Sequence, residues 1–224
     1  MSWIDEQLMK HIFVYSKDPF DPVIVKNIPN GWKLIGKGNF AAVFTHPSLD
    51  EKVVKVYAKN REGITEEIMV YKKLGEHNAY SRLYEYGERY LVLKKLEGIT
   101  LYQAFSTGTF IQKTVIEDVD KAIHFAKSKG LNPTDIHGKN ITMKDGKGYI
   151  VDVSDFLKTY SCPKWKHFKR GYYLIYLPLF KNIRIPFPHW LLERIRKSYQ
   201  FYLLVTGFRR KQELYSNKDR SNLS

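Results

Sequence analysis

One short polar loop holds the side chains best suited to chemistry in this sequence. The stretch NPTDIHGKN, residues 132–140, sets Asp135 and Asn140 five residues apart, with His137 between them. A carboxylate can accept a proton, and carboxylate and amide oxygens are ligands that Mg²⁺ accepts. Polar loops are common, however, and the Asn-Pro pair at the start marks only a turn. The meaning of this loop therefore depends on the rest of the chain.

A pair of glycines near the start could serve a phosphate group. In IGKGNFAAVF, residues 35–44, Gly36 and Gly38 flank Lys37 between two predicted strands, and Val43 follows five residues after Gly38. Glycine lets backbone N–H groups approach a polyphosphate because no Cβ stands in the way. An ordinary β-hairpin turn explains the pair equally well when it is taken alone.

A lysine and a glutamate could form a charged pair behind these glycines. Lys55 lies within the valine-rich run VVKVY, where a single lysine normally faces solvent. The predicted helix TEEIMVYKKL, residues 65–74, begins with Thr65 as a candidate N-cap and carries two acids in its first turn. Glu67 fits the apolar pattern of that helix better than Glu66 does. Helix-dipole stabilisation accounts for at least one of the two acids.

Two further stretches carry candidate binding groups. LVLKKLEGITL, residues 91–101, has Leu93 in its apolar part and the main chain of residues 94–96, Lys95 included, just after it. YIVDVSDF, residues 149–156, places Asp152 directly after an apolar run. Asp152 follows Asn140 by 12 positions. Asp155 is a nearby alternative carboxylate.

In order and spacing, these stretches resemble the motifs of protein kinases over about residues 32–160. The resemblance implies ATP and Mg²⁺ as cofactors, with Asp135 as the base that accepts the proton of the substrate hydroxyl. Asn140 and Asp152 would hold Mg²⁺, and His137 would assist the transferred phosphoryl group or hold the loop. The implied nucleotide-binding residues are Gly36, Lys37, Gly38, Val43, Lys55, Glu67, Leu93 and Lys95; Lys55 also counts as catalytic.

The motifs depart from the common kinase pattern in several places. Ala41 replaces the third glycine, and Pro133 and Thr134 precede Asp135, so no arginine is there to pair with a phosphorylated activation loop. His137 replaces the usual lysine, which resembles aminoglycoside and choline phosphotransferases and lipopolysaccharide sugar kinases. Val153 and Ser154 stand where Asp-Phe-Gly has its last two residues. The sequence therefore resembles a small, atypical member of the protein-kinase-like superfamily.

The predicted fold is α+β with two lobes, a β-rich N-lobe with one helix and a short, mostly helical C-lobe. We expect an N-terminal helix and Pro-rich connector over residues 1–31, the N-lobe over 32–97, a truncated C-lobe over 98–210 and a polar, disordered tail over 211–224. Within the C-lobe, we expect a helix over 111–129, a hairpin over 141–153, and breaks at Pro163, Pro178, Pro186 and Pro188.

Composition limits the setting and the partners. The single cysteine, Cys162, rules out an internal disulfide framework and suits a reducing cytoplasm, and no signal peptide or membrane-spanning stretch is visible. The net charge is +14, and residues 158–224 contain 15 Lys or Arg against 3 Asp or Glu. This basic, aromatic region suggests an acidic protein substrate, an anionic membrane surface or a nucleic acid as partner.

Three classes of function follow. The first is an ATP-dependent serine/threonine protein kinase, with a small-molecule or sugar kinase as the alternative that shares every catalytic residue. The second is a pseudokinase, which is disfavoured because all the expected ATP and metal positions are present. The third is a membrane-surface or nucleic-acid-binding scaffold that uses the basic C-terminal region.

Overall fold

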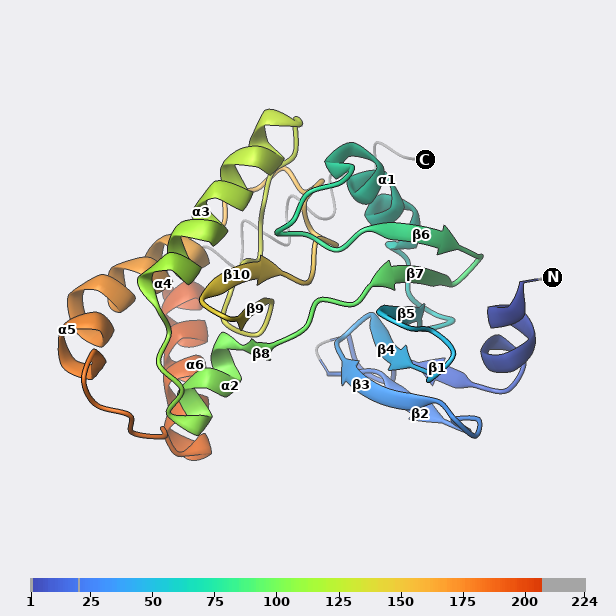
Figure 1. Cartoon of the computed structure of the whole chain (residues 1–224), viewed down its shortest axis with the longest axis horizontal. Helices are drawn as coiled ribbons and strands as arrows, with labels where there is room; N and C mark the ends of the chain where they lie inside the picture. The colour runs from blue at the N-terminus through green and yellow to red at the C-terminus, as the bar shows by residue number, and fades with distance from the viewer. Residues whose placement is uncertain (1, 20, 207–224) are drawn as a thin grey trace. The chain divides into compact units, whose positions relative to one another are not determined.

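The chain folds as two compact units, Met1–Leu96 and Glu97–Ser224. The computed structural model describes residues 2–19 and 21–206. The predicted tail over residues 211–224 lies outside this range, as do the last four residues of the predicted C-lobe. Figure 1 shows the elements of both units.

The first unit is built on a five-stranded antiparallel sheet in the order β3-β4-β5-β7-β6. Its central strand, β5, is the valine-rich run that contains Lys55, and all three of its valines are buried. Helix α1 packs on β6 and β7 (Figure 1). The elements of the sheet and its helix are β3 (Lys33–Lys37), β4 (Ala41–Thr45), β5 (Lys52–Tyr57), α1 (Ile64–Leu74), β6 (Leu83–Tyr86) and β7 (Tyr90–Lys94).

The first 31 residues contain more than the predicted helix and connector. A short π-helical turn, η1 (Asp5–Met9), is followed by strands β1 (Phe13–Tyr15) and β2 (Ile24–Lys26), which pair antiparallel. Leu8 and Val14 are fully or almost fully buried and join the core of the sheet with Phe44 and Val54. The connector interpretation was wrong here because three-residue strands are too short to show a period of two.

Helix α1 begins earlier than its sequence suggested. Its N-cap is Gly63, in the left-handed region with φ 115°, and Thr65 lies within the first turn. The predicted Thr65 cap is therefore wrong. Glycine adopts this backbone conformation without steric cost, so the chain can turn sharply into the helix there.

The second unit combines a small sheet with helices. Strands β9 (Ile141–Lys144) and β10 (Lys147–Ile150) form the predicted hairpin, and β8 (Ile99–Thr100) pairs with β9. Helix α2 (Leu101–Thr107) starts with a capping box between Thr100 and Gln103. Helix α3 (Lys113–Ser128) buries its predicted apolar stripe, and β10 packs against it. The residues of that stripe are Val115, Val119, Ala122, Ile123 and Ala126; Ile116, which was not predicted, is buried as well.

The C-terminal helices follow the proline pattern except at one position. Pro163 and Pro188 are the N-cap residues of α4 (Lys164–Gly171) and α6 (His189–Val205). Pro178 was predicted to break the chain but lies inside α5 (Leu177–Phe180), which continues α4 through the π-helical turn η2 (Tyr172–Tyr176). A π-turn changes the local hydrogen-bonding pattern, so the helix tolerates a proline that donates no N–H.

The two units together confirm the predicted fold class. The chain is α+β, with a β-rich unit that carries one main helix and a second unit that is mostly helical, as in the two-lobed protein-kinase-like fold. Within the described part of the chain, no helix is long and apolar enough to cross a membrane.

Candidate phosphotransfer site

Gly36 lies within β3, opposite Val43 of β4, and Gly38 directly follows that strand. The Gly38 N–H donates to the Ala41 carbonyl at 2.9 Å, and the Gly38 carbonyl accepts from Val23 N–H at 2.8 Å. Neither Gly36 nor Gly38 has a positive φ. A Cβ on Gly36 would meet no protein atom within 4 Å, and one on Gly38 would only touch the Ala41 carbonyl at 4.0 Å. Neither backbone strain nor packing requires glycine here, whereas a close-approaching ligand would.

Lys55 forms an ion pair inside the first unit. Its Nζ donates to Glu67 Oε1 at 2.8 Å and to Oε2 at 2.7 Å. The Lys55 side chain is 12% exposed and the Glu67 side chain is fully buried. Tyr57 donates a further hydrogen bond to Glu67. The structure therefore pairs Lys55 with Glu67, while Glu66 is only half-buried.

Val43 and Lys55 share one face of the sheet. They are direct partners across β4 and β5, and side chains of such partners project to the same side. Lys55 is also opposite Leu91 of β7. This register places the predicted phosphate-binding lysine beside the strand that follows the glycine pair.

The segment after Leu93 is already hydrogen-bonded within the first unit. Leu93 is buried in β7. The Lys94 N–H donates to the Arg82 carbonyl, its carbonyl accepts from the Ser81 hydroxyl, and the Lys95 N–H donates to the Glu51 carbonyl at 2.7 Å. The Lys95 N–H is therefore already bonded within the protein. The main-chain groups of this segment that remain suited to a ligand are the Lys94 carbonyl, through its second lone pair, and those of Leu96.

In the second unit, the polar loop holds Asp135 in an uncommon conformation. Asp135 has φ 56°, in the left-handed region. The Asn140 side chain donates to the Asp135 carbonyl at 3.2 Å, and the Asn140 N–H donates to the His137 carbonyl at 2.9 Å. A left-handed residue other than glycine costs on the order of 1 kcal/mol or more, so these bonds must hold it.

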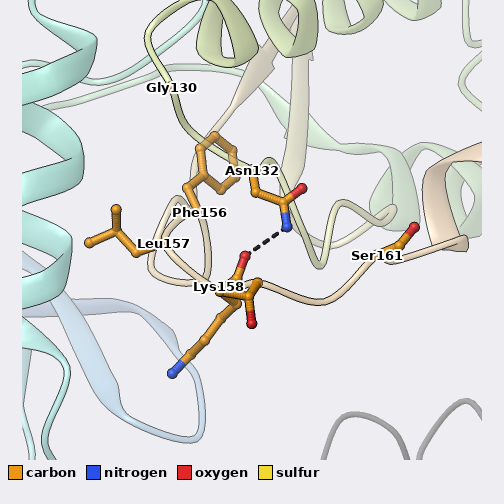
Figure 2. A pocket seen from close by; sticks show the side chains of 7 residues that line it. Gly130, Asn132, Phe156, Leu157, Lys158 and Ser161 are labelled. Atoms are coloured by element: carbon orange, nitrogen blue, oxygen red, sulfur yellow. Dashed lines mark hydrogen bonds between the residues drawn. The ribbon is translucent and has the colours of Figure 1, made fainter. Parts of the chain in front are cut away.

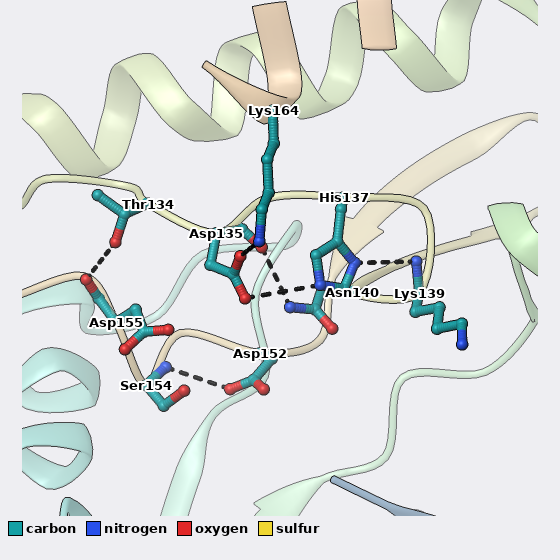
Figure 3. A network of polar contacts seen from close by, with 9 residues as sticks. All are labelled: Thr134, Asp135, His137, Lys139, Asn140, Asp152, Ser154, Asp155 and Lys164. Carbon is teal, nitrogen blue, oxygen red and sulfur yellow. Dashed lines mark hydrogen bonds and ion pairs between the residues drawn. The ribbon is translucent and has the colours of Figure 1, made fainter. Parts of the chain in front are cut away.

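Two side chains contact the Asp135 carboxylate, as Figure 3 shows. Lys164, the first residue of α4, donates to Oδ1, and His137 Nε2 lies 3.5 Å from Oδ2. His137 Nδ1 accepts from the Lys139 N–H, so the neutral ring carries its proton on Nε2, facing Asp135. Burial alone would raise the pKa of Asp135, but His137 and the charge of Lys164 outweigh it and hold this pKa at about 2.

Asn140 and Asp152 are adjacent through the backbone. The Val151 N–H, one residue before Asp152, donates to the Asn140 carbonyl at 3.0 Å. Asp152 Oδ1 accepts from the Ser154 N–H at 3.2 Å (Figure 3). The Asn140 amide nitrogen is used by the Asp135 carbonyl, which leaves its amide oxygen as the atom suited to a cation.

The alternative carboxylate, Asp155, is in a different environment. Burial, together with the negative charges of Asp135 and Asp152, raises the pKa of Asp155 to about 6. Its carbonyl accepts a hydrogen bond from the buried Thr134 hydroxyl. Asp155 therefore favours the protonated form more than an ordinary aspartate does.

Sequence reasoning missed the residues that fix the loop to the segment after Asp152. The Asn132 N–H donates to the Phe156 carbonyl at 2.8 Å, and its side chain donates to the carbonyls of Lys158 and Tyr160 at 2.7 and 2.9 Å. Lys164 was also missed, because it is 29 residues from Asp135 and no spacing rule connects the two. The Asn-Pro pair at 132 was interpreted only as a turn.

A hollow of about 410 Å³ is lined by the start of the polar loop and by the segment after Asp152 to which the loop is bonded (Figure 2). It contains none of the predicted site residues. We therefore assign it no part in the chemistry. The lining residues are Gly130, Asn132, Phe156, Leu157, Lys158, Thr159 and Ser161.

The donor set in the second unit fits Mg²⁺. Over residues 2–19 and 21–206, no group of three or more His, Cys, Asp or Glu side chains is arranged to hold a metal ion. Mg²⁺ typically uses only one or two protein carboxylates, with the remaining ligands from water and substrate phosphates. Asp152 and the Asn140 amide oxygen provide oxygen ligands of that kind.

Comparison with known proteins agrees with this geometry. No family model matches the chain. Over 215 residues it is 29% identical to the "Putative serine/threonine-protein kinase YrzF" of Bacillus subtilis (strain 168), and the match spans 94% of this chain and 98% of that protein. This similarity and the two-unit α+β fold are consistent with the protein-kinase-like superfamily.

Proposed function

We propose that the protein is an ATP-dependent phosphotransferase that transfers the γ-phosphoryl group to a serine or threonine hydroxyl of a protein. The observation that carries the proposal is the ion pair between Lys55 and the fully buried Glu67. Burying two charges costs free energy that attraction only partly returns, so such a pair is weak as a stabilising device. A lysine held there has a clear use in binding the α- and β-phosphates of ATP.

The first unit would bind the nucleotide. Gly36, Lys37 and Gly38 would cover the phosphates, since no protein atom occupies the space that a Cβ at Gly36 would take. Val43 and Leu93 would contact the adenine, whose polar edge would meet the main chain of residues 94–96. Because the Lys95 N–H already donates to Glu51, we assign the donor in that segment to Leu96.

The second unit would provide the base and the metal ligands. Asn140 and Asp152 would hold Mg²⁺, which when bound neutralises charge on the phosphates. Asp135 accepts the hydroxyl proton as the acceptor oxygen forms its bond to the γ-phosphorus. The bond from that phosphorus to the β,γ-bridging oxygen breaks, and ADP leaves with the electron pair. His137 orients Asp135 through Nε2.

The test is transfer of labelled phosphate from ATP in the presence of Mg²⁺, with a generic protein substrate and mapping of the labelled residues. We expect label on serine or threonine in the wild type and a loss of transfer in Asp135→Asn with nucleotide binding kept. Asp152→Ala should lose use of Mg²⁺-nucleotide. An Asp135→Asn variant with an unchanged transfer rate would refute the proposed base.

A small-molecule or sugar acceptor is the second candidate, favoured by the D-x-H-x-x-N pattern at Asp135–His137–Asn140. In that case the same assay shows ATP consumption that depends on Asp135 without label on protein. Binding of nucleotide without any turnover, once acceptors and activators have been varied, would instead favour a pseudokinase.

A further inference from the structure

The loop around Asp135 contains no Lys or Arg before Lys139, yet Asp135 faces a cation. The two residues before it are Pro133 and Thr134, and His137 stands where a lysine is common. The cation comes instead from α4, whose first residue, Lys164, donates to Asp135 Oδ1. Its side chain is 25% exposed and that of Asp135 is 27% exposed, so water screens this pair less than a surface pair.

Lys164 belongs to α4, which is hydrogen-bonded to α3. The next residue, Trp165, is buried, and its Nε1 donates to Asp120 Oδ1 of α3 at 2.8 Å. Lys169, one turn further along α4, donates to both oxygens of Asp120 at 2.8 and 3.0 Å. The start of α4 therefore cannot move away from the loop without breaking these contacts.

The segment that leads to α4 is also held by neutral groups. Asn132 bonds the carbonyls of Phe156, Lys158 and Tyr160, and Thr134 bonds the carbonyl of Asp155. All of these bonds join the loop to the chain after Asp152. They need no phosphorylated residue, so the position of Lys164 is set by the fold itself.

We propose that Lys164 is a positioning residue that orients the Asp135 carboxylate, in place of a cation within the loop. This inference rests on the proposed function, because it assigns Asp135 as the base. A carboxylate has four lone-pair sites, so contacts from Lys164 and His137 still leave room for the acceptor hydroxyl.

The test compares Lys164→Gln and Lys164→Arg with Lys166→Gln, an exposed lysine on the same helix. We expect Lys164→Gln to lower kcat at least about tenfold with the KM for ATP little changed, because the Asp135 carboxylate loses an orienting contact. Lys164→Arg should retain most activity. A Lys164→Gln enzyme with the kcat of Lys166→Gln would overturn the inference.

A second readout does not need catalysis. The side-chain nitrogen resonance of Lys164 in the full chain reports this contact directly, and we expect it to shift in Asp135→Asn by clearly more than that of the exposed Lys166 does. Equal shifts of the two lysines would overturn the inference even if the wild type transfers no phosphate. Conversely, a wild type without turnover but with the expected Lys164 shift would refute the proposed function and leave the pairing standing.

Helix α6 supports a second, independent inference. Its outward face follows helical spacing through Trp190, Arg194, Lys197, Phe201 and Val205, all exposed. Trp190, Phe201 and Val205 are 62%, 66% and 68% exposed, which is unusual for large apolar side chains on one stripe. The Arg194 guanidinium lies 5.8 Å from the centre of the Trp190 ring.

The charge around this stripe has one sign. From α4 to α6, residues 164–205 contain nine Lys or Arg and a single acid, Glu193, which pairs with Arg196 at 2.7 Å. An apolar stripe interrupted by cations suits the boundary between lipid headgroups and acyl chains. We propose that the outward face of α6 binds an anionic membrane surface peripherally.

The test is co-sedimentation of the full chain with phosphatidylcholine vesicles that contain or lack phosphatidylserine. We expect binding only to the anionic vesicles, with a clear loss in Trp190→Ser/Phe201→Ser and in Arg194→Gln/Lys197→Gln. Ile28→Ser, which replaces an exposed apolar side chain of the first unit, should bind as the wild type does. Failure to sediment with anionic vesicles, or retention of RNA by the same residues without vesicle binding, would overturn the proposal.

Discussion

Removing the charge of Glu67 should destabilise the first unit strongly. Glu67 is fully buried, it accepts two hydrogen bonds from Lys55 at 2.7 and 2.8 Å, and it accepts another from Tyr57. At an effective dielectric constant of about 20, a pair at this separation gains roughly 6 kcal/mol of attraction before desolvation is subtracted. Loss of one partner of a buried pair costs about 3 to 5 kcal/mol, and Glu67→Gln should fall at the lower end because the amide keeps a polar contact.

Urea unfolding of the full chain, followed by circular dichroism, measures this effect. The matched control is Glu66→Gln, one residue earlier in α1 and only half-buried, which should change the free energy of unfolding by no more than about 0.5 kcal/mol. The double variant Lys55→Met/Glu67→Leu should be more stable than either of its single variants, because it leaves no unmatched charge. Equal effects of Glu67→Gln and Glu66→Gln would refute the assignment of a strong buried pair.

Two further predictions concern stability. The pKa of Asp155 is raised to about 6, against an ordinary 3.8. The folded protein therefore binds this proton more tightly than the unfolded chain does, and the free energy of unfolding falls as pH rises from about 4 through 6. Without Mg²⁺, Asp155→Asn should therefore stabilise the protein at pH 8 by about 1 to 2 kcal/mol and have little effect near pH 4, as measured by urea unfolding at both pH values; equal effects would contradict the shift. Gly98 has φ 116°, and an added Cβ would collide with the Met143 carbonyl, so Gly98→Ala should lower the free energy of unfolding by about 2 kcal/mol or more. Gly171 lies in a helix with open space around it, so Gly171→Ala should leave that free energy unchanged or raise it by up to about 1 kcal/mol. Thermal unfolding of the two variants should show opposite or clearly unequal shifts, and a similar loss in both would argue against the close approach at Gly98.

Local sequence patterns predicted the elements that repeat a period or carry a recognisable motif. The valines around Lys55, the apolar stripe of α3 and the Lys-Asp-Gly-Lys turn between β9 and β10 each determine their own structure over a few residues. Strands β1 and β2 were missed because each has three residues and gains its burial from the sheet core. Pro178 was misjudged because the rule against helical proline takes no account of a preceding π-turn.

The same distinction applies to the candidate site. Asp135, Asn140 and Asp152 were recognisable because their spacing along the chain is short and regular. Lys164 and Asn132 were not, since their roles depend on contacts 24 to 29 residues away that only the folded chain creates. Even Lys55 and Glu67 needed the fold to show which of two adjacent acids forms the ion pair.

The backbone conformation of Asp135 indicates that this loop does more than connect α3 to β9. Four described non-glycine residues have positive φ: Asn27, Glu51, Asp135 and Asp145. Glu51 lies in the turn before β5 and Asp145 in the turn between β9 and β10, so turn geometry accounts for these two, while Asn27 directly follows β2. Asp135 lies in a bend outside any hairpin, where the Asn140 side chain must bond its carbonyl to hold it. A loop that only connected α3 to β9 could avoid this strain, whereas a loop that aims a carboxylate toward Lys164 and His137 requires it.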